Sequence, residues 1–403
     1  MRIYSVLGAP PEIQAYGLAK YSRSAQSLEQ SIDELSAQRA EQFLNTFYFQ
    51  YGHASIADLA HVTLALENIS MRAAFHVVDE PLWDGQERSS RYQNFRDSGF
   101  YIPPELQGTP DLAHYQEALE VALGHYERFS AALTDLLKTL IPRPEGMTSG
   151  TYTRKLRARA FDVARYFLPL ATLTSVGQVS SARTLERQIS RLAGSPLTEV
   201  RAISAAMKEA SQAPGYNFVE RKLAATWERD GVTPEQIAAQ RQALGEAGII
   251  AAGAVPTLVK YTEAATYEPE TLAAARELLR PYFDDLGDVP DTQSAILIPP
   301  DTDLLDALTM EMLYLTDTRG RRYNQLLLVA QAMPAEVKQR LFALTMAKRG
   351  PHDDWLRMHR LGYTLGFDLL LDFGALRDLH RHRRCVQILP DLSWRLGCDD
   401  ART

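Results

Sequence analysis

The sequence predicts a helix-rich α+β protein, because helical periodicity covers much of the chain and strand-like runs are few. Apolar residues recur every three or four positions from Asp111 to Leu140, as one face of an amphipathic helix requires. The best strand candidates are the runs 62–66 and 364–371, the second of which is closed by Gly374. A hydrophobic fraction of 45% is ordinary for a globular chain, and 403 residues are enough to bury a large core.

The same helical spacing recurs in further segments, and proline marks the breaks between them. We expect helices over 30–50, 154–167, 184–211, 234–247, 303–316 and 335–348. Pro290, Pro299 and Pro300 lie among aspartates between two helical blocks, which is typical of a linker. We therefore expect a first unit over 1–285, a linker over 286–301 and a second unit over 302–403.

Composition argues against several classes of protein. No apolar run reaches the roughly 18 residues that span a bilayer, and the first residues lack the apolar segment of a secretory signal. The two cysteines, Cys385 and Cys398, do not make a disulfide framework, so we expect a cytoplasmic protein without a membrane partner. A site within residues 1–384 must work without a thiol. The net charge of −7 argues against broad binding to nucleic acid, although local basic patches can hold phosphates.

Common nucleotide-binding loops are absent from the sequence. Gly245, Gly248 and Gly253 lie in an alanine-rich, helix-like stretch, whereas a Rossmann loop connects a strand to a helix. No glycine-rich run ends in Lys-Ser or Lys-Thr, which excludes a P-loop. Any nucleotide must therefore be held by other groups.

Three polar clusters have the chemistry to hold an anionic ligand. The first, 51–58, contains His53 and Ser55 and precedes the strand candidate at 62–66. The second, 86–92, combines a carboxylate, two hydroxyls, two guanidinium groups and a phenol. Its arginines offer planar donor groups to a phosphate, and its serine hydroxyls and backbone N–H groups can complete the cradle. The third, 377–384, carries four arginines and two histidines and follows the strand candidate at 364–371.

Each cluster also has a purely structural interpretation. A run of charges is most often a solvated helix face, which applies to 377–384. His53 can be a hydrogen-bonded structural histidine, and Arg91 with Tyr92 can be a surface packing pair. His380 and His382 lack carboxylate or thiolate partners, so we expect no metal site.

The order of the first two clusters resembles the signature region of the flavin-dependent thymidylate synthase (ThyX) family. The family signature begins with Gly-His-x-Ser, which is followed by an acidic residue, a strand and the motif Glu-x-Ser-x-Arg-Tyr. In this chain Glu87, Ser89 and Arg91 belong to the last motif. Asp79, Glu80 and Pro81 stand where the family carries an Arg-His-Arg triplet, so the charge is reversed there. Further similar segments lie at 165–170, 181–183, Arg191, 199–201 and 255–261, with Ser181 in place of the family's usual Asn.

The second half resembles another, incomplete copy of this signature region. Gly350, Pro351 and His352 precede the strand candidate at 364–371, and Arg381, His382 and Arg383 supply the triplet that the first copy lacks. The resemblance implies tandem ThyX-like units, each a small mixed or antiparallel sheet flanked by long helices. It also implies that the second unit is incomplete.

The resemblance implies the synthesis of dTMP from dUMP. Methylenetetrahydrofolate would supply the carbon, NADPH the reducing equivalents, and FAD would mediate between them. Ser89 and Arg91 would be catalytic, and the dUMP-binding set would be Gln86, Glu87, Ser89, Arg91 and Arg191. The FAD-binding set would be His53, Ser55, Arg183, Arg381, His382 and Arg383. Family sites lie between subunits, so we expect a site assembled from motifs of both units in a homo-oligomer, a dimer of tandem units.

Two other functions remain open at this point. The replaced triplet, Ser181 and the short second copy fit a non-catalytic relative that keeps the fold as a nucleotide-binding or scaffold protein. Binding of nucleic acid through the basic run 381–384 fits the negative net charge poorly, and it would require strongly salt-dependent affinity.

Overall fold

The computed structural model describes residues 8–20, 30, 56–246, 253–284, 295–298, 302–350, 353–360, 366–380, 385–391 and 393. These residues form two compact units, Met1–Ala264 and Ala265–Thr403. The boundary between the two units, at Ala264 and Ala265, lies before the predicted linker over 286–301. The reason is that helix α11 (Tyr267–Leu279) packs against α13 (Leu304–Thr316) and α15 (Ala335–Ala347) and shares their core.

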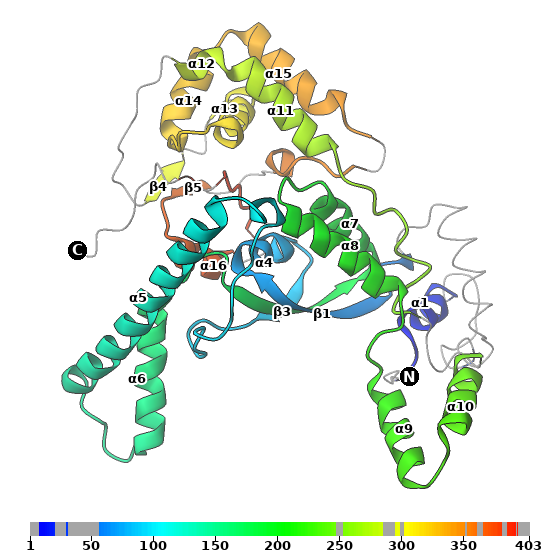
Figure 1. Ribbon diagram of the computed structural model, residues 1–403. Coiled ribbons are helices and arrows are strands. Elements are labelled where there is room, and N and C mark those ends of the chain that lie inside the picture. Colours follow the sequence, from blue (N-terminus) through cyan, green and yellow to red (C-terminus); the bar gives the residue numbers. More distant parts are fainter. Residues whose placement is uncertain are drawn as a thin grey trace. The chain divides into compact units, whose positions relative to one another are not determined.

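The first unit is built on a three-stranded antiparallel sheet in the order β1-β3-β2 (Figure 1). The strands are β1 (His61–Ser70), β2 (Asp84–Glu87) and β3 (Leu173–Ser181). Alternate residues of β1 and β3 are buried, so one face of the sheet lies on the core. This arrangement confirms the helix-rich α+β class. Strand β1 is longer than the expected 62–66, and β2 and β3 were not predicted.

Helices cover the buried face of this sheet. They are α4 (Met71–Val78), α7 (Ala182–Ala193) and α8 (Thr198–Gln212). The prediction of one helix over 184–211 is wrong, because the helix is interrupted between α7 and α8 at Gly194, Ser195 and Pro196. The Gly194 N–H donates to the carbonyl oxygens of Arg191 and Leu192 at the end of α7, and Pro196 cannot continue that helix because it lacks an N–H.

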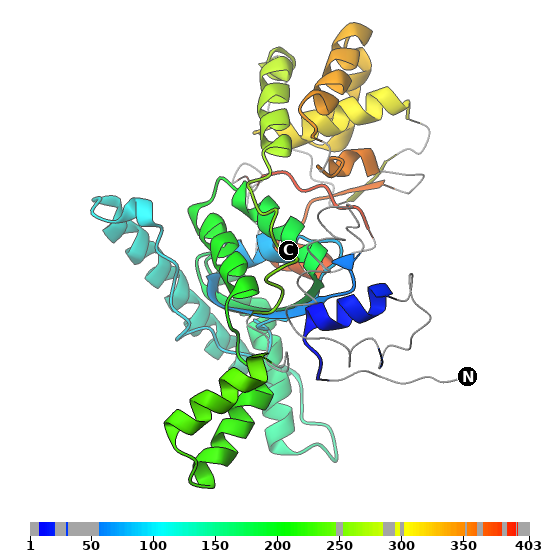
Figure 2. The same cartoon turned by 90° about the vertical axis from the view of Figure 1, so that its right-hand side faces the viewer.

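Two antiparallel helix pairs also belong to the first unit (Figure 2). One joins α5 (Asp111–Leu140), which matches its predicted bounds, to α6 (Ser149–Ala164), and the other joins α9 (Phe218–Arg229) to α10 (Pro234–Glu246). The remaining elements are α1 (Pro11–Lys20), η3 (Pro104–Leu106) and η4 (Arg165–Phe167).

The second unit is a helical cluster with a two-stranded antiparallel ribbon. Its core is supplied mainly by α11, α13, α14 (Tyr323–Ala332) and α15. The ribbon pairs β4 (Ala295–Ile298) with β5 (Gly366–Leu369), which lies inside the strand candidate at 364–371. Also present are α12 (Pro281–Asp284), η5 (Arg357–Arg360) and α16 (Phe373–Leu379). In neither unit does a described helix have the length and apolar character needed to cross a bilayer.

Candidate functional site

The expected substrate-binding segment spans the end of a strand and the start of a loop. The segment 86–92 is predicted to be a loop. In the structure Gln86 and Glu87 belong to β2, where they pair with Gly177 and Val176 of β3. Since β2 has no apolar residue, its strand conformation depends on this pairing. Successive strand residues face opposite ways, so Gln86 is exposed and Glu87 half-buried.

Ser89 and Arg91 lie in the loop that continues from β2. The Arg88 N–H donates to Ser175 O at 2.9 Å, and the Leu173 N–H donates to Gly99 O at 3.0 Å, so both ends of the loop are fastened to the start of β3. The Ser89 hydroxyl accepts from the Arg91 N–H at 3.3 Å. Arg91 is exposed, and its Nε donates to Asp162 of α6 at 2.8 Å. The structure therefore brings four of the predicted residues, Gln86, Glu87, Ser89 and Arg91, onto one strand and loop.

Gly85 allows β2 to lie close to β3, and we expect Gly85→Ala to disturb this segment. A Cβ at residue 85 would overlap the carbonyl oxygen of Gly177 and lie 2.6 Å from Trp83 Cζ2. The backbone must then shift, which should cost about 1–3 kcal/mol of stability and displace Gln86. Thermal unfolding followed by circular dichroism measures the effect. Gly177→Ala in the facing strand is the matched control, because a Cβ there meets nothing within 4 Å; equal loss in both variants would contradict the explanation.

Three arginines on one side of α7 form the second part of the candidate site. Arg183, Arg187 and Arg191 are spaced by four residues, so they lie on neighbouring turns of the helix. Arg183 Nη1 donates to Asp58 at 3.0 Å, and its side chain is 54% exposed. Arg183 and Arg191 are predicted site residues, whereas Arg187 was not predicted, although its spacing of four from both of them indicates it.

Arg191 and Gln188 hold the C-terminal end of α4. Arg191 Nη2 donates to His76 O at 3.0 Å, and Gln188 Nε2 donates to Val77 O at 2.7 Å. These bonds satisfy carbonyl groups that the end of a helix leaves without partners. Arg191 Nε is buried and has no hydrogen-bond partner among the described residues. Arg191 thus has a structural role, and it keeps an unsatisfied donor that a ligand oxygen could accept from.

Glu80, at the position of the family's triplet, pairs with Arg187. Glu80 is only 4% exposed, and its carboxylate forms an ion pair with the Arg187 guanidinium. An arginine that could face a phosphate is therefore bound to a carboxylate of the same unit. The acidic residue that replaces the basic triplet thus neutralises Arg187, which lowers the capacity of the middle of α7 to hold an anion.

The loop with Ser89 and Arg91 and the first arginine of α7, Arg183, belong to opposite ends of β3. The loop with Ser89 and Arg91 is fastened beside Ser175, whereas Arg183 follows Ser181 at the other end of the strand. Six strand residues at about 3.3 Å each separate these points by roughly 20 Å. The expected substrate residues on the loop and the expected cofactor residue Arg183 therefore do not converge on one point of this unit.

Two further segments that resemble the family hold the framework in place. The Ser181 hydroxyl accepts from the Thr184 N–H at 3.2 Å and caps α7, a role that serine and asparagine fill about equally well. Glu199 accepts from the N–H of Ser70 at 2.7 Å and from its hydroxyl at 2.6 Å, at the junction of β1 and α4. In the described structure these residues make local contacts that position β1, α4 and α7.

Five of the predicted cofactor residues lie outside the described residues: His53, Ser55, Arg381, His382 and Arg383. The structure does describe residues 366–380, which lead to Arg381, His382 and Arg383. Strand β5 is followed by Asp372, whose side chain caps α16 by accepting from the Ala375 N–H at 2.9 Å. In the first unit the capping residue, Ser70, is the last residue of β1, and the short helix α4 follows it directly. The local order of strand, cap and helix is the same in both units.

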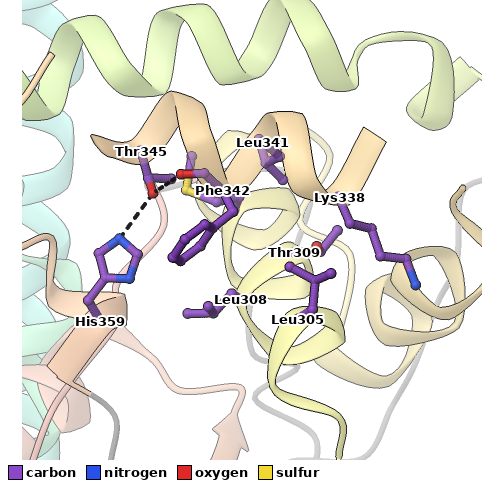
Figure 3. A pocket seen from close by; sticks show the side chains of 9 residues that line it. Leu305, Leu308, Thr309, Lys338, Leu341, Phe342, Thr345 and His359 are labelled. Atoms are coloured by element: carbon purple, nitrogen blue, oxygen red, sulfur yellow. Dashed lines mark hydrogen bonds between the residues drawn. The ribbon is translucent and has the colours of Figure 1, made fainter. Parts of the chain in front are cut away.

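A small pocket in the second unit does not suit a nucleotide (Figure 3). Helices α13 and α15 with η5 line a pocket of only about 10 Å³, room for about one water molecule, whereas typical ligand sites have roughly 300–1,000 Å³. His359 and Lys338 lie at opposite ends of it, and His359 Nε2 is 3.2 Å from the Thr345 hydroxyl. Burial lowers the pKa of His359. Lys338 is paired with Asp306, so its charge is not directed at an open anion site.

The first part of the chain matches the sequence model of a known family. This is the thymidylate synthase complementing protein family, and the match covers residues 8–214. It includes the loop with Ser89 and Arg91, all three strands of the sheet and the helices α4, α7 and α8 that cover it. The match ends before the helix pair α9–α10.

Similar proteins extend over both units. A UPF0159 protein of Chlamydia muridarum (strain MoPn / Nigg) is 25% identical over 422 aligned residues, which cover 98% of this chain and 73% of that protein. A UPF0159 protein of Chlamydia pneumoniae is 23% identical, covering 96% and 71%. Among solved structures, the UMP/dUMP methylase PolB from Streptomyces cacaoi bound with 5-Br dUMP is similar to half of this chain and 86% of its own, with 19% identity and a TM-score of 0.35.

Proposed function

The chain belongs to the thymidylate synthase complementing protein family, and from this premise we propose that it is an FAD-dependent thymidylate synthase that methylates dUMP to dTMP. Methylenetetrahydrofolate would donate the carbon and NADPH the reducing equivalents. The supporting observation is the loop with Ser89 and Arg91, held at the start of β3 inside the family-matched segment. The dUMP-binding set remains Gln86, Glu87, Ser89, Arg91 and Arg191.

The loop offers groups suited to a nucleotide phosphate. Ser89 is half-buried and Arg91 exposed, so a hydroxyl and a guanidinium face solvent from one short segment. Asp162 holds Arg91 through Nε, which fixes the orientation of a planar group that binds phosphate with two parallel donors. Burial of a phosphate against these donors would strengthen each contact by excluding water. Ser89 and Arg91 would thereby bind and orient dUMP for the reaction.

FAD would be held by Arg183 and by residues beyond the described ranges, namely His53, Ser55, Arg381, His382 and Arg383. The Arg183 guanidinium fits this assignment because its side chain is half-exposed and, among the described residues, Asp58 accepts from its Nη1 only, so a phosphate can still approach it. Bound FAD would pass electrons from NADPH to the transferred carbon, without a cysteine nucleophile. Because the strand between the loop and Arg183 is roughly 20 Å long, a site completed by the second unit or by another copy of the chain, in a homo-oligomer, accounts for both sets of residues.

We expect the purified protein to retain or take up FAD, and dUMP to perturb the flavin absorbance. Arg91→Ala should weaken the dUMP response about 10- to 100-fold, because it removes charge-assisted hydrogen bonds worth about 1.5–3 kcal/mol. Arg96→Ala is the control, since Arg96 lies in the same loop but pairs with Glu127 of α5 at 2.8 Å. Flavin uptake with an intact dUMP response would justify a tritium-release assay. Absence of flavin at every FAD concentration would overturn the proposal.

A second function has its own supporting observation. The buried Glu80 bound to Arg187 suits a relative that keeps the fold for nucleotide binding or as a scaffold and has lost catalysis. Such a protein would bind dUMP or another nucleotide without retaining FAD. Isothermal titration with dUMP in the absence of flavin separates this function from the first.

A further inference from the structure

Arg88 lies at the centre of the loop that presents Ser89 and Arg91. Each nitrogen of its guanidinium donates to a different residue of the loop: Nε to Gln93 Oε1 at 2.9 Å, Nη1 to Ser98 Oγ at 2.8 Å, and Nη2 to Asn94 O at 3.1 Å. All three acceptors lie between five and ten residues further along the chain. The loop therefore folds around this one side chain.

The guanidinium also rests on an aromatic ring that anchors the loop. Arg88 Cζ is 4.2 Å from the ring centroid of Phe95, within the range of a cation–π contact. Phe95 is only 1% exposed and packs in a cluster with Leu123 and Tyr126 of α5. The Phe95 N–H donates to the hydroxyl of Tyr126 at 3.5 Å. Arg88 therefore stacks on the ring of Phe95, and Phe95 anchors the loop to the helix pair α5–α6.

Ser89 and Arg91 lie between the two anchors of this loop. The Arg88 N–H holds the loop to β3, and the Arg88 side chain fixes its far side at Gln93, Asn94 and Ser98. Between these points the Gln93 N–H donates to Ser89 O at 3.2 Å, which closes a turn that contains Arg91. Arg88 thus holds both ends of this turn: its backbone N–H bonds to β3, and its side chain bonds to Gln93 and Asn94 beyond the turn.

We infer that Arg88 is a positioning residue, which orders the turn carrying Ser89 and Arg91 so that the two side chains can bind the phosphate of a pyrimidine nucleotide. This inference rests on the proposed function for the choice of ligand, and on the geometry of the loop for the role of Arg88. Arg88 itself does not touch the ligand. Lysine cannot replace it, because a single ammonium group cannot reproduce a planar fork that donates in three directions while stacking on a ring.

The test compares Arg88→Lys with Arg96→Lys in the full-length protein. Hydrogen exchange over residues 89–98 reports the order of the loop, and titration of the FAD-loaded protein reports dUMP affinity. Arg88→Lys should exchange faster in this segment and bind dUMP about 10- to 100-fold more weakly, with unchanged FAD affinity and a raised KM. Arg96→Lys should behave as the unaltered protein, since its partner Glu127 lies outside the loop.

Each other outcome is decisive. Unchanged exchange in Arg88→Lys, or faster exchange with unchanged dUMP affinity, overturns the inference. If the unaltered protein binds neither FAD nor dUMP, the proposed function fails together with the substrate role, while the exchange comparison still decides whether Arg88 orders the loop. If Arg88→Lys does not fold, the double variant Gln93→Ala, Ser98→Ala takes its place. It removes two of the acceptors of Arg88, and Gln93 is exposed and Ser98 half-buried. This variant must also exchange faster over the loop and bind dUMP more weakly.

Discussion

Replacing Asp368 with alanine is expected to destabilise the second unit by about 3–5 kcal/mol, because it leaves a buried arginine without its counter-ion. Asp368 and Arg322 are 6% and 5% exposed. Asp368 Oδ2 accepts from Arg322 Nε at 2.7 Å and from the Tyr323 N–H at 2.9 Å, and its backbone oxygen accepts from Arg322 Nη2 at 3.1 Å. The pair fastens β5 to the start of α14.

The control for this prediction is an exposed ion pair of the same unit. Glu270 and Lys348 are 2.9 Å apart with side chains 50% and 42% exposed, so Glu270→Ala should cost less than about 1 kcal/mol. Hydrogen exchange over α13 and α14 in the full chain assigns the loss to this unit. The double variant Arg322→Met, Asp368→Leu should recover much of the stability, because it removes both buried charges. Equal losses for Asp368→Ala and Glu270→Ala would contradict the explanation.

Asp368→Ala also tests the proposed second FAD-binding segment. Strand β5 leads through the cap Asp372 into α16, after which Arg381, His382 and Arg383 follow in the sequence. If these residues bind FAD as proposed, loosening β5 should lower FAD affinity while the dUMP-binding loop of the first unit keeps its hydrogen-exchange protection.

Elements with a regular apolar pattern could be predicted from the sequence, and elements formed by long-range pairing could not. Helix α5 matches its expected bounds because its apolar face is continuous. Strand β3 was missed because three of its buried residues, Thr174, Gln178 and Ser180, are polar. Gln178 is satisfied by Trp83 and Gln188, contacts to residues 95 and 10 positions away, which local periodicity does not reveal.

The candidate site could be predicted only as far as short motifs define it. Ser89 and Arg91 were found because they share one compact motif with Glu87. The pairing of Glu80 with Arg187 joins residues 107 positions apart, so the sequence showed a charge reversal without its compensating partner. Arg88 was inside the recognised motif, but its role depends on three acceptors whose positions only the folded loop defines.

Replacing Glu311 with glutamine is expected to flatten the pH dependence of stability of the second unit between about pH 5 and 8. Glu311 lies on α13, is 3% exposed, and its Oε2 has no hydrogen-bond partner among the described residues. Burial raises the pKa of this carboxyl group from 4.5 to about 8. Because the folded pKa exceeds the unfolded one, the unfolded state loses its proton first, and stability falls as pH rises from about 4.5 to about 8. At pH 7 the cost is on the order of 3 kcal/mol, since each pKa unit corresponds to about 1.4 kcal/mol.

Glutamine keeps the shape of the side chain but cannot ionise, so the variant does not incur this cost. Urea unfolding at pH 5, 6, 7 and 8, with hydrogen exchange over α13 to assign the transition, should show that Glu311→Gln gains stability over the unaltered protein as pH rises. Glu336→Gln, an exposed substitution on α15, should leave the slope unchanged. Parallel pH profiles for the unaltered protein and Glu311→Gln would show that Glu311 is ionised or solvated in the folded state. Since Glu311 also raises the pKa of Tyr323, which burial brings to about 12, the same variant should lower the pKa of that phenol in an ultraviolet titration.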